Sequence, residues 1–552
     1  MPALPLNSAA PGRRTTLAVH GRLVLLLAAL VALPAAAAEL RQPLPDVHAL
    51  VGVRVVTAPG EVLESATVVV RDGVIESVGD VEPPADAAVI EFERGEDQPP
   101  LTVYPGLIDP YLVVETDDEG DQDESVPEGR HALIRPDATV DAWPGDTVVT
   151  RRQAGFTTAL LAPGEGLLRG RSLVANLGEG GLNVNRLRAE VAQHAHLHER
   201  GPSGAYPQSL MGSVALFRQT LLDARWQQRA QQAWQADPAQ ARPEWLPGLD
   251  ALAPVLDGER PLVFETRDVH DTLRILELVD DDIDLVLVGH GAEYQRLDQF
   301  PRRVPHILTM DLPSAPDVED ETDRDVSLEE LRHWRRAPEN AQRLIEAGVP
   351  VLFTAHGLGN PADLFGHLAT AIERGLDADR ALAGLTTGPA EWLGIGDRAG
   401  RVAPGFMANF VLVEGELFAE KPTISEVWID GARFELAKLE PPAIDPAGTW
   451  ALTLGLPGMG DVDAELVLSG EPTSLSGTLS AMGNDTPLSE IRVSGKQLQI
   501  RIDASRYGGS GTIAIDMDIE GDRGRGTGSG PFGEFTVRGQ RTSDPDEEDA
   551  HQ

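Results

Sequence analysis

The sequence predicts an α/β protein whose central part contains a parallel β-sheet, with mainly β segments on both sides. Three observations predict this class. Between residues 105 and about 395, short apolar runs alternate with helical patterns, an order typical of parallel βαβ units. Before this part, residues 51–57 and 65–79 are rich in β-branched side chains. Beyond Pro442 the composition shifts to Gly, Ser and Thr with period-two alternation.

Length and charge bound the class of protein further. At 552 residues the chain can hold one large domain and one or two smaller modules. It has 87 acidic against 46 basic residues and a net charge of −41. The electric field of this negative charge repels nucleic acid and anionic lipid, so neither is expected as a partner. A solvated acidic surface suited to salty surroundings explains the excess of acidic residues. With no cysteine, the chain has no disulfides, thiolate metal sites or cysteine nucleophiles.

The N-terminus has the pattern of a processing segment. Arg13, Arg14 and Arg22 precede an apolar run at 23–33, and four alanines follow at 35–38. The run is too short to span a bilayer comfortably, so we expect 1–38 to be a removed signal peptide. The mature protein is then periplasmic or secreted and has no membrane span. The Arg13-Arg14 pair leaves open whether export is Sec-dependent or twin-arginine-dependent.

Within the three parts, several elements have clear local signals. Asp72-Gly73 is a strong two-residue hairpin turn. Helical patterns include 271–279, and Ser327 with Glu330 forms a capping box ahead of another helix. The predicted buried strands of the central part are 156–162, 262–266, 285–289, 307–310 and 349–354.

The last part is predicted to be a separate all-β domain. Alternating segments such as 498–503 and 512–518 are separated by turn residues, which is typical of an antiparallel sandwich or barrel. We place this domain at 443–541. The charged tail that follows, 542–552, is expected to be disordered.

Several motifs occur in an order that resembles the amidohydrolase superfamily, over roughly residues 50–435. Pro105-Gly106-Leu107-Ile108-Asp109 is similar to the end of the first barrel strand in that superfamily. The other matching segments are 154–158, the exit helix at 381–394, the return signature at 401–414 and, for the secreted imidazolonepropionase-like branch, 206–219 and 222–226. The resemblance implies a (β/α)8 TIM barrel at 105–395. It also implies a small composite β-module built from both flanks, 45–104 and 396–440.

The resemblance also implies a divalent metal site, for which this chain lacks the first ligands. In the family the first strand continues into His-x-His, whose imidazoles share one face of the strand and hold the metal. Here those two positions are Tyr111 and Val113, and neither side chain can replace an imidazole. A strand-four lysine that bridges two metals is also excluded, because the only lysines are Lys421, Lys438 and Lys496.

The remaining ligand positions are partly changed. Glu265 stands where strand five supplies a histidine, and His290 matches the histidine of strand six. At strand eight Ala355 replaces the aspartate that accepts a proton from metal-bound water. His356 comes one residue later and could act only if the strand has ended.

Metal-activated water requires about three protein ligands and a base. We therefore expect no metal and no other cofactor. The alternative is a divalent ion such as zinc held by Glu265, His290 and a displaced His356, which are the only catalytic candidates.

A second histidine group and a glycine-rich stretch have ordinary explanations. On a strand, His194, His196 and His198 would share one face and could bind a metal. The flanking residues instead indicate a helix that ends in a loop, so we predict solvated histidines. The stretch 164–170 has no lysine to hold a phosphate, and loop flexibility explains its glycines.

Two classes of function follow. The first is an exported hydrolase of non-peptide or cyclic carbon–nitrogen bonds, as the resemblance implies. The second is an inactive barrel that serves as a periplasmic binding or assembly module, as the missing ligands imply. A small-molecule or peptide-like ligand is the partner class that remains, and the sequence leaves oligomerisation, substrate and the role of the β-domain open.

Overall fold

The protein is described here by a computed structural model. The described residues are 46–92, 100–114, 131–198, 206–244, 246–316, 326–419, 422–436, 443–456, 460–470, 472, 475–481, 483–488, 490–503, 512–530, 533 and 535–543. The predicted signal peptide, 1–38, and most of the predicted tail lie outside these ranges. Strand β27 continues through Ser543, so the first two residues of that tail belong to a strand.

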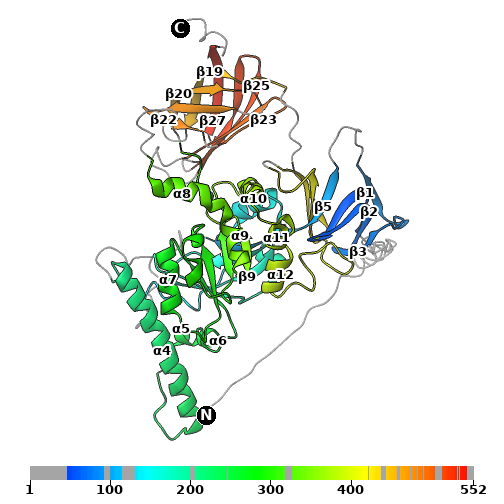
Figure 1. The fold of residues 1–552 in the computed structure, drawn as a ribbon. Coiled ribbons are helices and arrows are strands. Elements are labelled where there is room, and N and C mark those ends of the chain that lie inside the picture. The colour runs from blue at the N-terminus through cyan, green and yellow to red at the C-terminus, as the bar shows by residue number, and fades with distance from the viewer. Residues whose placement is uncertain are drawn as a thin grey trace, which may run out of the picture.

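One sheet joins segments from both flanks of the central part. Its order is β18-β17-β16-β5-β1-β2-β3, and β4 pairs with β1 (Figure 1). Its strands are β1 (Val47–Ala58), β2 (Glu61–Arg71), β3 (Val74–Gly79), β4 (Ala88–Glu91), β5 (Leu101–Pro105), β16 (Phe410–Glu414), β17 (Thr423–Ile429) and β18 (Ala432–Glu435). The junction is the antiparallel ladder between β5 and β16, so chain segments about 300 residues apart lie side by side.

The hairpin turn predicted at Asp72-Gly73 is confirmed. Asp72 has φ 49° and Gly73 has φ 81°, the left-handed pair that a two-residue turn between twisted strands requires. Glycine is also needed for space, because a Cβ at Gly73 would lie 2.8 Å from the carbonyl oxygen of Asp430. The turn therefore packs directly against the loop between β17 and β18.

Two sheets form the central part. One has the order β10-β9-β7-β6 and the other β15-β14-β13-β12-β11-β8. Their strands are β6 (Leu107–Val114), β7 (Phe156–Pro163), β8 (Leu168–Arg171), β9 (Leu173–Asn176), β10 (Arg186–Arg188), β11 (Gln193–His196), β12 (Leu262–Glu265), β13 (Leu285–Gly289), β14 (His306–Thr309) and β15 (Val351–Thr354). The predicted central strands are all present, and β6–β7 and β11 to β15 pair in parallel.

One region departs from the predicted βαβ order. Residues 168–176 run antiparallel to β7 on one side and to β11 on the other, and so belong to both sheets. The prediction of a loop at 164–170 is therefore wrong for its last residues, which begin strand β8 and include the buried Leu168 and Arg169. Its glycine has a packing role, because a Cβ at Gly170 would lie 2.5 Å from the carbonyl oxygen of Ala138.

The two sheets also approach each other at β15 and β6. Thr354 Oγ1 lies 2.9 Å from the carbonyl oxygen of Tyr111 and 2.6 Å from Asp109 Oδ1. Within the described ranges, no backbone ladder pairs β15 with β6. The middle of β6 and the carboxyl end of β15 are thus held together by a side chain.

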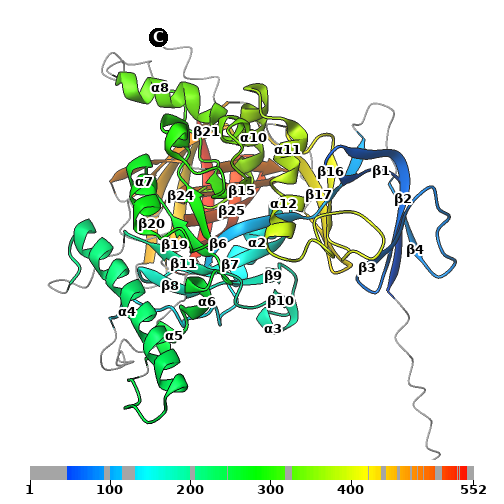
Figure 2. The ribbon, with the colours of Figure 1, turned by 60° about the horizontal axis from the view of Figure 1, so that its bottom comes forward.

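Helices cover the central sheets. The predicted capping box is confirmed at the start of α8, where Ser327 and Glu330 each accept the other's backbone N–H. The longest helix, α4, extends away from the sheets in Figures 1 and 2. The helices are α2 (Gly145–Gln153), α3 (Leu182–Asn185), α4 (Leu210–Ala236), α5 (Pro247–Asp250), α6 (Ala253–Leu256), α7 (Val269–Leu278), α8 (Leu328–Arg336), α9 (Asn340–Glu346), α10 (Asp363–Glu373), α11 (Ala378–Ala383) and α12 (Thr387–Trp392), with short 3-10 turns at 293–295, 297–299 and 337–339.

The predicted separate all-β domain is present at the C-terminal end. Its antiparallel sheet has the order β22-β21-β20-β19-β27-β26-β25-β24-β23 and stands apart in orange and red in Figure 1. Its strands are β19 (Gly448–Leu456), β20 (Gly460–Ser469), β21 (Ser476–Ala481), β22 (Asn484–Pro487), β23 (Glu490–Ser494), β24 (Gln497–Asp503), β25 (Thr512–Glu520), β26 (Arg523–Ser529) and β27 (Phe535–Ser543). Trp450 is wholly buried in a core of its own, which fits an independent hydrophobic unit.

None of the helices in the described ranges has the length and apolar character needed to cross a membrane.

Candidate functional site at the strand ends

The residues singled out in the sequence lie at one edge of the central sheets. Glu265 is the last residue of β12, and Tyr111 lies in β6. His356 follows β15, which ends at Thr354, and His290 follows β13. Because carboxyl ends of parallel strands meet at the same edge, these positions are neighbours as the motif spacing implies. Their side chains, however, are not all directed to one point.

A buried hydrogen-bonded network replaces the first ligand pair. The phenol of Tyr111 donates to Glu265 Oε2 at 2.8 Å. Arg169 Nη1 donates to the same carboxylate oxygen at 2.8 Å and to the Tyr111 hydroxyl at 2.7 Å. Arg169 comes from the antiparallel strand β8 and is 7% exposed. A cation, a phenol and a carboxylate thus form a closed triangle; with His194, His196 and His356 we call them the strand-end cluster.

The environment of this triangle sets its protonation. Burial lowers the pKa of the Arg169 guanidinium, but the oxygens of Tyr111 and Glu265 outweigh burial and raise it. Burial would raise the pKa of Glu265, yet His356 and Arg169 hold it well below its usual range. Burial, reinforced by Glu265, raises the pKa of Tyr111 against the opposing charge of Arg169. At neutral pH the triangle therefore contains a guanidinium, a carboxylate and a neutral phenol.

The histidines predicted to be solvated in a loop are instead buried, so that prediction is wrong. His194 and His196 lie in β11, are 0% and 5% exposed, and face the same side of the strand. These residues form a strand and not the helix that the flanking sequence indicates. The reason is that β11 lies between β12 and β8, whose backbone hydrogen bonds satisfy its N–H and C=O groups. His198, just beyond the strand, has Nε2 2.6 Å from Asp271 Oδ2.

Both buried imidazoles are held neutral. His196 Nδ1 lies 3.0 Å from Arg169 Nη2, and since a guanidinium can only donate, Nδ1 is the acceptor. Burial and then the charge of Arg169 lower the pKa of His194 and of His196 to about 3. His194 stacks on the ring of Tyr111 at a centroid distance of 5.7 Å. Among the described residues, neither of its ring nitrogens has a hydrogen-bond partner.

His356 enters the cluster because β15 has ended. Its backbone N–H donates to Thr354 Oγ1 at 3.0 Å, which turns the chain immediately after the strand. The imidazole Nε2 then lies 3.8 Å from Glu265 Oε1, and the ring meets Tyr111 edge-on at a centroid distance of 4.9 Å. The side chain of His356 is 27% exposed and that of Glu265 is 18% exposed, so His356 is the more accessible of the two.

Asp109, the last residue of the Pro105 to Asp109 motif, supports the strand-end cluster and is not part of it. It is wholly buried, with Oδ2 3.3 Å from Arg151 Nε. Arg151 Nη1 also donates to the carbonyl oxygen of Ala355 at 3.1 Å. Asp109 and Arg151 therefore tie β6 to the segment that carries His356. The glycine of the same motif is required by packing, because a Cβ at Gly106 would lie 2.3 Å from Thr157 Oγ1.

His290 belongs to a separate network. Its backbone N–H donates to Glu293 Oε1 at 2.6 Å, and its ring Nε2 lies 3.8 Å from the same oxygen. Glu293 is wholly buried and also accepts from Asn340 Nδ2 at 2.6 Å. Burial would raise the pKa of Glu293, but the imidazoles of His290 and His306 lower it. His290 and Glu265 thus interact with different partners.

As they stand, these residues do not fit the metal that the family resemblance implies. Glu265 already pairs with Arg169, and the phenol of Tyr111 occupies the position of a ligand imidazole. Val113 and Ala355 carry no donor, and His290 is engaged with Glu293. In the part of the chain that the structure describes, no three His, Cys, Asp or Glu side chains lie close enough to hold one ion.

Arg169 is the residue of this site that sequence reasoning missed. It lies in the glycine-rich stretch that was assigned to a flexible loop. The available signal was the pair Leu167-Leu168 directly before it, because two adjacent leucines are typical of a buried segment. Nothing local indicated which carboxylate Arg169 would meet, since Glu265 lies 96 residues further along the chain.

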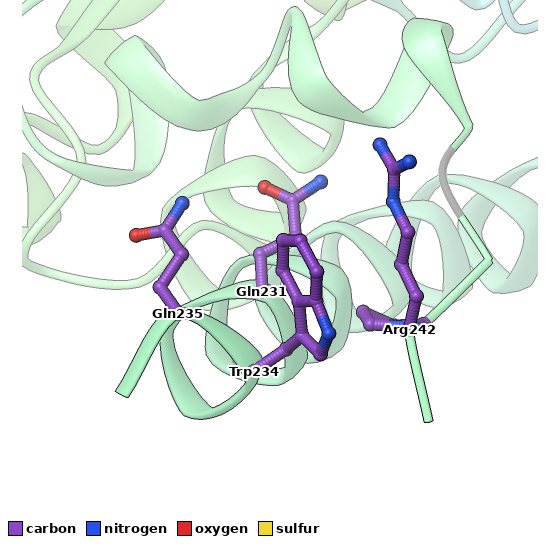
Figure 3. Close-up of a pocket in the computed structure, with 5 residues that line it drawn as sticks. Gln231, Trp234, Gln235 and Arg242 are labelled. Atoms are coloured by element: carbon purple, nitrogen blue, oxygen red, sulfur yellow. The ribbon is translucent and has the colours of Figure 1, made fainter. Parts of the chain in front are cut away.

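A surface hollow elsewhere is formed by different elements. It lies at the far end of α4, lined by Gln231, Trp234, Gln235, Arg242 and Pro243 (Figure 3). The guanidinium of Arg242 lies over the indole of Trp234, 5.4 Å from the ring centroid. This hollow contributes no residue to the strand-end cluster.

The geometry and the comparisons together define the class. A polar cluster at the carboxyl ends of mainly parallel strands lies where (β/α) domains carry their functional sites. The model of the Amidohydrolase family matches residues 333–434. The amidohydrolase from Thermotoga maritima MSB8 has a similar fold, with a TM-score of 0.55 and 17% identity, over 70% of this chain and 100% of that one.

A curated relative agrees with this class. The amidohydrolase tasK of Hapsidospora irregularis is 31% identical over 100 residues, which are 18% of this chain. The chain spans about 10% of the length of that relative. Residues 333–434 of this chain thus match the Amidohydrolase family, and the fold over 70% of the chain is similar to that of an amidohydrolase.

Proposed function

We propose that this protein is an exported member of the amidohydrolase superfamily that has given up metal-dependent hydrolysis and serves as a binding or assembly module. The observation that carries the proposal is the bond from the Tyr111 phenol to Glu265 Oε2, with Arg169 on the same oxygen. A carboxylate neutralised by a guanidinium and a phenol has little attraction left for a divalent ion. Metal-activated water then has neither its ligands nor its base.

A rigid strand-end cluster and an exposed apolar surface on α4 support binding better than chemistry. Tyr111, Arg169 and Glu265 hold one another, which makes the strand ends rigid. On the surface, α4 exposes Met211 and Trp226 at 84% and 57%. Large apolar side chains exposed on a projecting helix favour contact with another molecule.

Elemental analysis tests the proposal. The mature protein is purified from metal-supplemented medium, dialysed and assayed for zinc, iron and manganese. We expect far less than one equivalent of each. Near-stoichiometric metal that survives dialysis, and that is lost in Glu265→Gln, would overturn the proposal and restore a metal-dependent mechanism.

A second candidate is hydrolysis of a non-peptide or cyclic carbon–nitrogen bond without a metal. One observation favours it: the accessible imidazole of His356 lies beside Glu265 Oε1 at 3.8 Å. A carboxylate that orients a histidine is the arrangement of a general base. The test is turnover of a panel of cyclic and non-peptide amides by the wild type and His356→Gln. Turnover by the wild type that disappears in the variant supports this candidate. If neither protein turns over any substrate, the binding-module proposal stands.

Two further parts of the proposal concern export and closure of the sheet. N-terminal sequencing of exported protein should give a chain that starts near Glu39, and an intact Met1 would contradict export. We also propose that β6, β7, the 168–176 segment and β11 to β15 close into an eight-stranded barrel. The approach of Thr354 to the Tyr111 carbonyl supports closure. An experimental structure with backbone hydrogen bonds between β15 and β6 would establish it.

A further inference from the structure

We infer that Arg169 takes the place of the metal ion: its guanidinium is a built-in cation that neutralises Glu265 and excludes divalent ions from the strand-end cluster. The inference rests on the proposed function and deepens it. It adds to the missing ligands a residue that opposes metal binding and lies outside every expected ligand position. The supporting observations are the position of Arg169, its bonds and the state of its neighbours.

The position comes from the antiparallel segment. Strand β8 pairs with β11 in the order Gln193↔Arg171 and His194↔Gly170, so Arg169 enters beside the two buried imidazoles. The register of β11 with β12 places His196 directly opposite Glu265. Arg169 therefore lies between a neutral histidine and a carboxylate, the two donor types that a zinc ion would take.

The hydrogen bonds of Arg169 occupy the atoms that would otherwise bind a metal. One nitrogen, Nη1, reaches both Glu265 Oε2 and the Tyr111 hydroxyl, while Nη2 faces His196 Nδ1. A metal in this space would need the same carboxylate oxygen and the same ring nitrogen. Because a guanidinium remains protonated, the cation cannot be removed by raising the pH within the physiological range.

The neighbours are in the state that a nearby fixed cation produces. His194 and His196 are buried and neutral, with the charge of Arg169 acting in the same direction as burial. Both are uncharged bases, the form in which imidazole binds metals. While the guanidinium lies between His196 and Glu265, these imidazoles and Glu265 do not converge on one point; its removal would let them approach a common ion.

The test uses three variants of the whole mature chain and zinc as the probe. Arg169→Met removes the charge and keeps an unbranched apolar stem. Arg169→Lys is the matched control, because it keeps a cation at the same position. Arg169→Met with Glu265→Gln removes the carboxylate as well. Calorimetric titration and zinc-dependent thermal stabilisation are measured after circular dichroism has verified folding.

We expect Arg169→Met to bind about one equivalent of zinc at least about a hundredfold more tightly than the wild type, because a like charge a few ångströms away has gone. Arg169→Lys and the double variant should behave as the wild type does. Folded Arg169→Met with no gain in zinc affinity, or an equal gain in Arg169→Lys, would overturn the inference and leave the proposed function standing. Tight zinc binding by the wild type would instead overturn both.

If Arg169→Met does not fold, the inference is tested on the wild type by nuclear magnetic resonance. Its arginines are labelled with 15N, and Arg169 is assigned by the signal missing from Arg169→Lys. We expect guanidinium protons that exchange slowly with solvent and do not change on addition of zinc or a chelator. Exchange as fast as that of a free arginine, or a shift caused by zinc, would overturn the inference.

Discussion

Glu265, which is partly buried, and Glu293, which is wholly buried, lie at or beyond the ends of the neighbouring strands β12 and β13, and they are stabilised in different ways. Glu265 is held by a full positive charge, Arg169, and by the Tyr111 phenol. Glu293 is held by two neutral donors, the backbone N–H of His290 and the amide of Asn340, and by the nearby imidazoles of His290 and His306. The comparison teaches that the strand-end cluster depends on a permanent cation, Arg169, whereas the Glu293 network depends on neutral donors and imidazoles.

The largest expected effect comes from breaking the charge balance. Glu265→Leu leaves Arg169 buried without a carboxylate, and we expect the free energy of unfolding to fall by about 3–5 kcal/mol. Glu265→Leu combined with Arg169→Met should recover most of the loss, because an apolar pair needs no charge balance. Urea unfolding monitored by circular dichroism measures both. If the double variant is less stable than Glu265→Leu, charge balance is not what stabilises the cluster.

A smaller effect is expected from the donor network. Asn340→Ala removes one neutral donor from the buried, charged Glu293, which should cost about 1.5–3 kcal/mol. Glu293 retains its backbone donors, so the carboxylate stays ionised. Asn340→Asp is the informative control, since it keeps the shape and sets two carboxylates against each other. A control as stable as the wild type would show that the donor does not matter.

The smallest expected effect per pH unit is a dependence of the free energy of unfolding on pH above pH 4.5, to which His194 and His196 of the strand-end cluster and His306 of the Glu293 network contribute. The pKa of His194 is about 3 in the folded protein against 6.5 ordinarily, so between these values the unfolded chain binds more protons. Stability therefore falls as the pH falls from about 6.5, by up to about 1.4 kcal/mol per pH unit for this imidazole. His196 has the same direction and a similar value. The lowered pKa values of Glu265 and Glu293 add a further loss below about pH 4.5.

His194→Phe tests this pH dependence, because phenylalanine can keep the stacking on Tyr111 without a titrating group. Unfolding by urea at pH 6.5, 5.5 and 4.5 should show a slope reduced by about one proton relative to the wild type. An unchanged slope would mean that His194 does not remain neutral in the folded protein.

Several elements followed from local sequence signals. The Asp72-Gly73 turn, the capping box of Ser327 and Glu330 and the apolar central strands are set by contacts within a few residues. The prediction at 187–198 failed for the opposite reason. Those residues have a helical pattern, but β11 forms because β12 supplies ladder partners 69 residues downstream and β8 supplies them from residues 168–171 upstream. Tertiary pairing overrides local preference there.

The sequence by itself determined which family positions had changed, because the identities of Tyr111, Val113, Glu265 and Ala355 need only the motif spacing. It also determined the acidic charge, the absence of cysteine and the separate C-terminal β-domain. Only the tertiary structure decided what stands at the strand ends. The bonds from Arg169 to Tyr111 and Glu265 span 58 and 96 residues. Such contacts depend on strand register, which a sequence pattern specifies for each strand alone and not for the pairing between strands.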